Sequence, residues 1–196
     1  MNLSLYRPTE LEKWLEKEYR SIGIEYASDM DLDLISSIFD VEIRTYAGPS
    51  FAEWKEDEYS FIFLNAYLNE KQRREVFFHE LCHPLQHVGQ QEIMPKSFIE
   101  LQEIQAKNFQ HYAAMPSYLL EEFKSVSPSL LVKVIAEEFC LTEPFVQHRL
   151  EQIQKRVQSA QYEEELIRRR NTKIVIDDDH VRRVIAELGR KQLEGA

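Results

Sequence analysis

The chain has 196 residues, of which 43% are hydrophobic and 30% charged, enough to bury the core of one domain or of one domain with a small appendage. It contains no run of about 18 apolar residues, so we expect no membrane-spanning helix, no secretory signal and a soluble cytoplasmic protein. Its two cysteines, Cys82 and Cys140, are too few for a disulfide framework and are typical of a reducing compartment.

Charge is spread unevenly along the chain. The formal net charge is -10, and residues 1–70 carry 15 acidic against 6 basic side chains, whereas residues 128–196 carry 12 of each. An acidic surface repels phosphate backbones and attracts cationic partners. We therefore expect no direct contact between nucleic acid and the N-terminal third, whose charge serves either a cationic partner or plain solubility.

The first 65 residues predict two short helices followed by a small three-stranded sheet. Apolar residues recur at helical spacing over residues 8–21, and a second helix is expected over residues 29–39. Residues 41–48 alternate as a strand does and end in turn residues. Residues 51–59 predict a second strand, and the apolar run at 60–65 predicts a third.

Helical patterns dominate after residue 69. Asn69 and Gln72 have the spacing of a capping box at the start of one helix, and another helix is expected over residues 97–115. The pattern then stays helical except at KIVID, residues 173–177, which predicts a short strand before a last helix. We therefore expect an α+β fold in three parts, which are residues 1–127 with the sheet, a helical part at 128–170, and a strand–helix tail at 171–196.

The segment HELCH holds two histidines four residues apart, His79 and His83, with Glu80 directly after the first. On a helix, residues i and i+4 lie on one face, so both imidazoles can bind one metal ion. Glu80 can then take a proton from a water molecule at that ion, as in zinc hydrolases. Such a short pattern also arises by chance on a polar helix face, but the capped helix and the apolar strand before it favour a metal site.

A catalytic zinc site needs a third protein ligand and keeps its fourth position open. The next helix offers Glu100 and Glu103. Ser97 and Glu100 have capping-box spacing, which gives Glu100 a structural task at the helix start. We therefore predict that His79, His83 and Glu103 bind Zn²⁺ and that Glu80 is the catalytic general base. An ordinary surface carboxylate is the alternative reading of Glu103.

HELCH, followed by Glu103-x-x-Ala106-x-x-Phe109 and by Met115-Pro116, resembles the ImmA/IrrE family of bacterial zinc metallopeptidases. The resemblance covers roughly residues 30–152 and includes IAEEFCLTEPFVQHRL, which is similar to the family's helix-turn-helix-like segment. It implies a zincin-like part with an edge strand that pairs with an extended substrate, followed by a mostly helical part. It also implies a regulatory protease that cleaves a helix-turn-helix repressor of a mobile element or stress response.

Residues next to the motif have more than one reading. Pro84 departs from the family pattern, and we expect it to bend the helix just past His83 because it cannot donate to the carbonyl of Glu80. His87 projects from the same face as His83. Its three interpretations are a fourth metal ligand, a partner of His83 and, as we favour, a residue of the cleft rim or of the packing. Cys82 falls on the apolar side of the helix, which predicts a buried packing residue.

Two later features are also read structurally. His111 and Tyr112 either steady an oxyanion or, as we expect, pack between helices. The helix-turn-helix-like stretch at 129–152 has only Lys133 and Arg149 as basic residues against four glutamates. That balance predicts a wall of the substrate cleft rather than a DNA reader.

The main alternative function is a non-cleaving antirepressor or toxin–antitoxin partner with a structural or absent metal. The tail at 153–196 has three readings, which are docking on the domain, binding a partner, and forming a homo-oligomer. A strand at 173–177 would suit the last of these, because an unpaired strand can add to another chain. A DNA-binding regulator is the weakest alternative because of the charge count.

Overall fold

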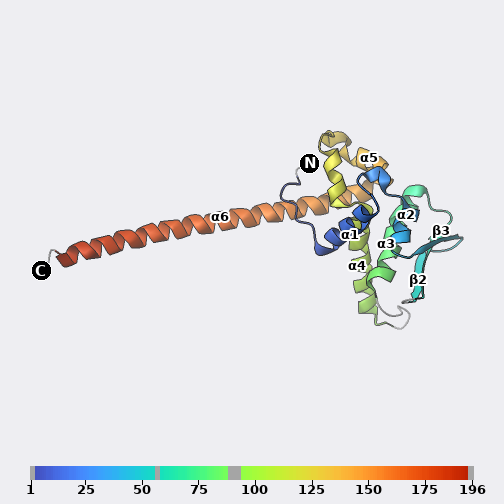
Figure 1. Ribbon diagram of the computed structural model, residues 1–196, viewed down its shortest axis with the longest axis horizontal. Helices are drawn as coiled ribbons and strands as arrows, with labels where there is room; N and C mark the ends of the chain where they lie inside the picture. Colours follow the sequence, from blue (N-terminus) through green and yellow to red (C-terminus); the bar gives the residue numbers. More distant parts are fainter. Residues whose placement is uncertain (1–2, 56–57, 88–93, 194–196) are drawn as a thin grey trace. The chain divides into compact units, whose positions relative to one another are not determined.

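The computed structural model describes residues 3–55, 58–87 and 94–193, which form the mixed α+β fold that the sequence predicts (Figure 1). The two N-terminal helices, the three strands and the helix that carries HELCH are all present, so the fold class is confirmed. The elements in chain order are α1 (Glu10–Ser21), η1 (Ala27–Asp29), α2 (Leu32–Ile38), β1 (Glu42–Tyr46), β2 (Phe51–Lys55), β3 (Tyr59–Asn65), α3 (Glu70–Gln86), α4 (Lys96–Ala114), η3 (Ser117–Phe123), α5 (Pro128–Glu138) and α6 (Glu143–Leu193).

Contacts between residues divide the chain into two compact units. One consists of residues 1–3 and 8–153, and the other of residues 4–7 and 154–196. Helix α6 therefore contributes its first residues to one unit and the rest of its length to the other. Within the part of the chain that the structure describes, no helix is both long and apolar enough to cross a lipid bilayer.

The sheet has the strand order β1-β3-β2, with β3 parallel to β1 and antiparallel to β2. Side chains alternate between the two faces of β3. Ile62 and Leu64 are fully buried on one face, whereas Phe61 and Phe63 lie on the other, where Phe63 stacks on Phe51 of β2. The order leaves β2 as an edge strand.

Helix α3 covers the sheet and starts at the capping box that the sequence predicts. The N–H of Gln72 donates to Oδ1 of Asn69 at 2.9 Å, and the Gln72 side chain accepts from the N–H of Asn69. Phe77, Phe78 and Leu81 are fully buried, and α3 contacts β2, β3 and α4 (Figure 1). The helix that carries the motif is thus fixed from its first residue and along its apolar side.

A buried arginine joins three helices of the first unit. Arg149, near the start of α6, is fully buried and donates to Oε1 of Glu12 in α1 at 2.5 Å and to the carbonyl of Met115 at 3.3 Å. Its guanidinium lies 4.7 Å from the centroid of the Tyr112 ring of α4. The positive charge of Arg149 is therefore paired with Glu12 in the interior of the first unit.

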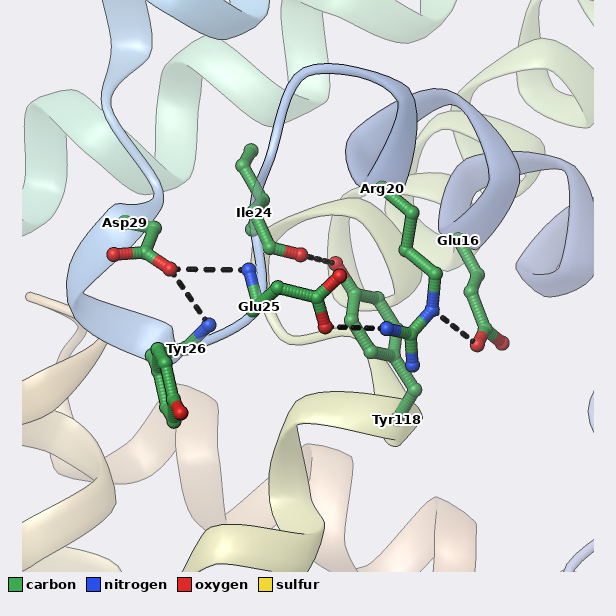
Figure 2. Close-up of polar contacts among 7 residues, drawn as sticks. All are labelled: Glu16, Arg20, Ile24, Glu25, Tyr26, Asp29 and Tyr118. Carbon is green, nitrogen blue, oxygen red and sulfur yellow. Dashed lines mark hydrogen bonds and ion pairs between the residues drawn. The ribbon is translucent and has the colours of Figure 1, made fainter.

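Figure 2 shows a second set of contacts, which ties η3 to the N-terminal helices. Arg20 donates to Glu16 at 2.9 Å and to Glu25 at 2.5 Å, and its guanidinium lies 4.3 Å from the centroid of the Tyr118 ring. The Tyr118 hydroxyl donates to the carbonyl of Ile24 at 2.9 Å. These bonds hold the segment after α4 against the chain between α1 and η1.

The predicted strand at residues 173–177 and the separate last helix after it are wrong, because α6 runs unbroken from Glu143 to Leu193. A strand needs a neighbouring strand for its backbone hydrogen bonds, and in the described residues the sheet consists of β1, β2 and β3 alone. In a helix each backbone N–H finds its acceptor four residues earlier. The preceding helical residues therefore extend through KIVID despite its β-branched side chains.

Candidate metal centre

Two helices bring the three predicted ligands together. α3 carries His79 and His83, α4 carries Glu103, and their ligand atoms all lie within 4.8 Å of one another. The Nε2 atoms of His79 and His83 lie 3.3 Å and 3.8 Å from the carboxylate oxygens of Glu103. Zinc bonds of about 2.0–2.2 Å in a tetrahedron separate ligand atoms by about 3.3–3.6 Å. The three residues therefore fit one divalent metal ion.

Helix α3 continues through Pro84, directly after the second histidine. Proline has no N–H, so the carbonyl of Glu80 lacks its usual helical donor. Helical bonding resumes at once, since the N–H of His87 donates to the carbonyl of His83 at 3.0 Å. Both histidines thus keep the i, i+4 relation that places their rings on one side of α3.

Glu103 is the α4 glutamate that meets the histidines, while Glu100 is exposed and pairs with Lys96 at 3.8 Å. The capping box expected from Ser97 and Glu100 is wrong. α4 begins at Lys96 with Pro95 in the N-cap position and no side-chain cap. Ser97 consequently lies inside the first turn, where its hydroxyl cannot take the place of a cap.

Glu80 lies in a largely buried position beside the three ligands. Burial and the negative charge of Glu103 raise the pKa of Glu80 to about 7, against the opposing effect of a hydrogen bond from the backbone of Ala52 in β2. A carboxyl group with a pKa near neutrality can both accept and return a proton. Glu80 therefore has the acid–base property that a general base at this site requires.

His83 is held on two sides. Its Nδ1 lies 3.0 Å from Nδ1 of His87, and its ring stacks on Trp54 of β2 with centroids 6.2 Å apart at an angle of 23°. Burial, then His87 and His79, lower the pKa of His83 to about 4, and burial lowers the pKa of His79. Both imidazoles are therefore mainly neutral at pH 7, the form that binds a metal ion.

Cys82 of α3 and His87, which directly follows the helix, are both buried. Cys82 is fully buried, as predicted, and burial raises the pKa of its thiol to about 12, so it stays protonated and packs as a small side chain. His87 is also buried, with its Nε2 4.0 Å from Sγ of Cys82. Its burial agrees with the packing role that we favoured, and its contact with His83 makes it a partner of that histidine as well.

His111 and Tyr112 pack against the start of α6, which confirms the expected packing role. The His111 ring has its centroid 4.3 Å from that of Phe145 and 4.7 Å from that of His148. Tyr112 lies under the guanidinium of Arg149. Burial, followed by His148 and Arg149, lowers the pKa of His111 to about 4. Both side chains therefore pack between helices, and Nδ1 of His111 is buried there without a hydrogen-bond partner among the described residues.

Sequence reasoning missed three residues around the ligands. Trp54 stacks on His83, the backbone of Ala52 bonds to Glu80, and the Gln105 side chain hydrogen-bonds to His87. In FAEWK, side chains alternate between the two faces of β2, so positions 52 and 54 lie on the same face. The sequence therefore indicates that these two residues point the same way. Nothing in the sequence indicates that this face meets the HELCH helix, because that depends on how α3 packs on the sheet.

The amino-acid sequence is similar to those of known proteins. Residues 37–151 match the model of the peptidase M78 family, the IrrE N-terminal-like domain. The chain is 29% identical over 159 residues to the phage-like element PBSX protein XkdA of Bacillus subtilis strain 168, covering 81% of this chain and 80% of XkdA. It is 24% identical over 146 residues to the uncharacterized protein YqaB of the same strain, covering 74% of this chain and 84% of YqaB.

The family match bears directly on the site. Its range of residues 37–151 includes the sheet, the HELCH helix and α4, and thus all three ligands and Glu80. It also covers more than half of the chain. This protein belongs to the peptidase M78 family of IrrE N-terminal-like domains, the ImmA/IrrE family that its motifs resemble.

Proposed function

We propose that this protein is a zinc-dependent endopeptidase. The observation that carries the proposal is the convergence of His79, His83 and Glu103, with Glu80 and its pKa of about 7 beside them. Two imidazoles and one carboxylate, with a fourth position open, are the donor set of catalytic zinc sites. Membership of a peptidase family supports the same class of reaction.

Each residue of the site then has one task. His79, His83 and Glu103 hold the zinc ion, which when bound polarises the scissile carbonyl and lowers the pKa of a water molecule. Glu80 accepts a proton from the attacking water and delivers it to the nitrogen of the leaving amine. Its place beside the three predicted ligands suits Glu80 to both steps, and a bound cation would favour its charged form, which is the one that accepts the proton.

Strand β2 offers a place for the substrate backbone. It is an edge strand, and Trp54 and Ala52 connect it to His83 and Glu80. An extended peptide can add to such an edge through main-chain hydrogen bonds. We infer that the substrate runs along β2 and that its scissile bond lies next to Glu80.

For the substrate we propose a helix-turn-helix repressor that is cut in the cytoplasm to relieve repression. The name of XkdA refers to a phage-like element, which supports a role in the control of a mobile element. The acidic residues 1–70 suit a cationic partner. The chain's own stretch at 129–152 is poorly suited to DNA, since Arg149 is buried and Lys133 alone is an exposed base there.

The decisive experiment pairs Glu80→Gln with wild type on a purified repressor encoded beside this gene. We expect Glu80→Gln to keep its zinc and to lose cleavage, whereas Glu100→Gln, a matched change at an exposed glutamate, keeps both. Cleavage that is unchanged in Glu80→Gln would remove Glu80 from the mechanism. An intact repressor held in a stable complex by the wild type would instead support the non-cleaving antirepressor.

A further inference from the structure

We propose that α6 pairs with α6 of a second copy of this chain, in antiparallel orientation, about a two-fold axis close to position 174. The proposal concerns positions 160–188, within the second unit, and does not depend on the metal centre. Three features carry it, namely exposed apolar side chains, the order of the charged runs, and the unbroken course of the helix.

Apolar side chains are exposed on both sides of position 174. Leu166 and Ile167 are 46% and 59% exposed, and Val181 and Val184 are 51% and 41% exposed. Positions 167, 174, 181 and 188, spaced by seven, are all apolar in the sequence, whereas Ala160, one heptad earlier, is already buried within this chain. A coiled-coil seam has two apolar positions in every seven residues, and here one of the two, the one that contains 167, 174 and 181, is apolar throughout. The spacing is symmetric about position 174, since 167 and 181 lie one heptad to either side.

Charged residues along the same helix come in runs of alternating sign. The arginines at 168–170 and the aspartates at 177–179 have their midpoint at positions 173–174. The glutamates at 163–165 and the arginines at 182–183 have the same midpoint. An antiparallel copy turned about this point sets every run opposite a run of the other sign. The four runs are 163–165 (Glu), 168–170 (Arg), 177–179 (Asp) and 182–183 (Arg).

The charged runs and the apolar repeat thus indicate the same two-fold axis, close to position 174. It places position 167 of one copy near 181 of the other, and the arginines at 168–170 near the aspartates at 177–179. A parallel pair in register would set each run against its own sign, which is destabilising. Charge pattern beside an apolar seam is what fixes orientation in paired helices, so antiparallel pairing follows.

The partner is a second copy rather than another part of the same chain. Folding α6 back on itself would make the same pairs, but this needs a break near position 174, and the helix has none between Glu143 and Leu193. The intrachain pairs of the glutamate run are exposed ones. Glu165 lies 2.9 Å from Arg169, and Arg7 lies 3.5 Å from Glu163. Exposed ion pairs of this kind are weak, so a partner helix can compete for the same charges.

The mass of the full-length protein in solution tests the pairing. Sedimentation equilibrium should give twice the chain mass of 23.3 kDa. Reversing the arginine run with Arg168→Glu, Arg169→Glu and Arg170→Glu should give a monomer, and so should reversing the aspartate run with Asp177→Lys, Asp178→Lys and Asp179→Lys. An equimolar mixture of the two variants should restore the double mass, because each reversed run then faces its opposite. A monomeric wild type would overturn the proposal.

A matched control separates the pairing from net charge. Lys13→Glu, Lys17→Glu and Lys124→Glu together change the charge as much as the arginine reversal does, at exposed sites outside α6, and should leave the dimer intact. Circular dichroism checks that each variant keeps its helix content. If a variant alone loses helix, the restored mass in the mixture still decides, since recovery on mixing requires complementary runs.

Cross-linking tests the orientation. Under oxidation, a mixture of Ile167→Cys and Val181→Cys chains should form disulfide-linked heterodimers, while neither variant alone should cross-link efficiently through α6. Wild-type protein with its native Cys82 and Cys140 gives the background. Efficient cross-linking of Ile167→Cys to itself would indicate a parallel pair and would overturn the antiparallel arrangement.

Discussion

Nδ1 of His83 lies 3.0 Å from Nδ1 of His87, the residue that caps the C-terminal end of α3. The other ring nitrogen of His83 faces Glu103 at 3.8 Å. When Nε2 binds a metal ion through its lone pair, Nδ1 carries the proton and donates to His87. His87 is itself held by a hydrogen bond with the Gln105 side chain. With zinc bound as proposed, His87 would therefore set the tautomer and the direction of His83.

Replacing His87 should weaken zinc binding without removing the site. In His87→Ala the Nδ1–H of His83 loses its acceptor, and we expect zinc affinity to fall by about 10–100-fold. Competition with a chromophoric chelator measures this constant independently of peptidase activity. His148→Ala, which removes an exposed histidine, should leave it unchanged. Equal affinities in the wild type and His87→Ala would show that His87 only packs.

The two glutamates of α4 should differ sharply in metal binding. Glu103→Ala removes one of three converging ligands, and we expect the protein to lose stoichiometric zinc. Glu100→Ala removes a carboxylate that pairs with Lys96 on the surface, and zinc should stay bound. Metal analysis after gel filtration gives the stoichiometry. Zinc that is retained by Glu103→Ala and lost from Glu100→Ala would assign the third ligand to Glu100.

The sequence indicated the metal cluster because its signal is local. His79 and His83 need only a helix to share a face, and a third donor in the next helix narrows the choice to two glutamates. The reason given for rejecting Glu100 failed, since α4 begins one residue before Ser97. What singles out Glu103 is the packing of α4 on α3. The same dependence hid Trp54, which reaches His83 through the packing of α3 on the sheet.

Glu80 should make the metal-free protein less stable as the pH rises from about 4.5 to 7. Its pKa is about 7 in the folded protein against an ordinary value of 4.5. In this window the folded state holds a proton that the unfolded chain releases, so the free energy of unfolding falls as the pH rises. Against Glu80→Gln, which cannot ionise, the wild type should lose roughly 2 kcal/mol across the window.

Urea unfolding of both metal-free proteins at several pH values measures this difference. His83 acts in the opposite direction, because its pKa is lowered to about 4, and its stabilising effect is lost as the pH falls below its ordinary value. Both proteins contain His83, so its effect cancels in the comparison. A difference between wild type and Glu80→Gln that does not vary with pH would contradict the raised pKa.

The parts of the fold that the sequence missed depend on long-range contacts. KIVID has the composition of a strand, but no described strand lies beside it, and α6 continues through it. Arg149 was counted only by its charge, as one of two basic residues in the helix-turn-helix-like stretch. In the structure it is fully buried against Glu12, a residue 137 positions away. Local pattern gives the type of most elements here, while tertiary packing decides which polar side chains are buried.

Arg149 should be one of the most sensitive positions for stability outside the metal centre. Its guanidinium is the partner of the buried Glu12 carboxylate and also binds the carbonyl of Met115. Removing one partner of a buried ion pair leaves an uncompensated charge and costs about 3–5 kcal/mol, so Arg149→Ala should lower the free energy of urea unfolding by that amount. Lys71→Ala, which breaks the pair with the exposed Glu137, should cost far less, because exposed ion pairs contribute little to stability. Equal losses in the two variants would show that the buried pair contributes no more than a surface contact.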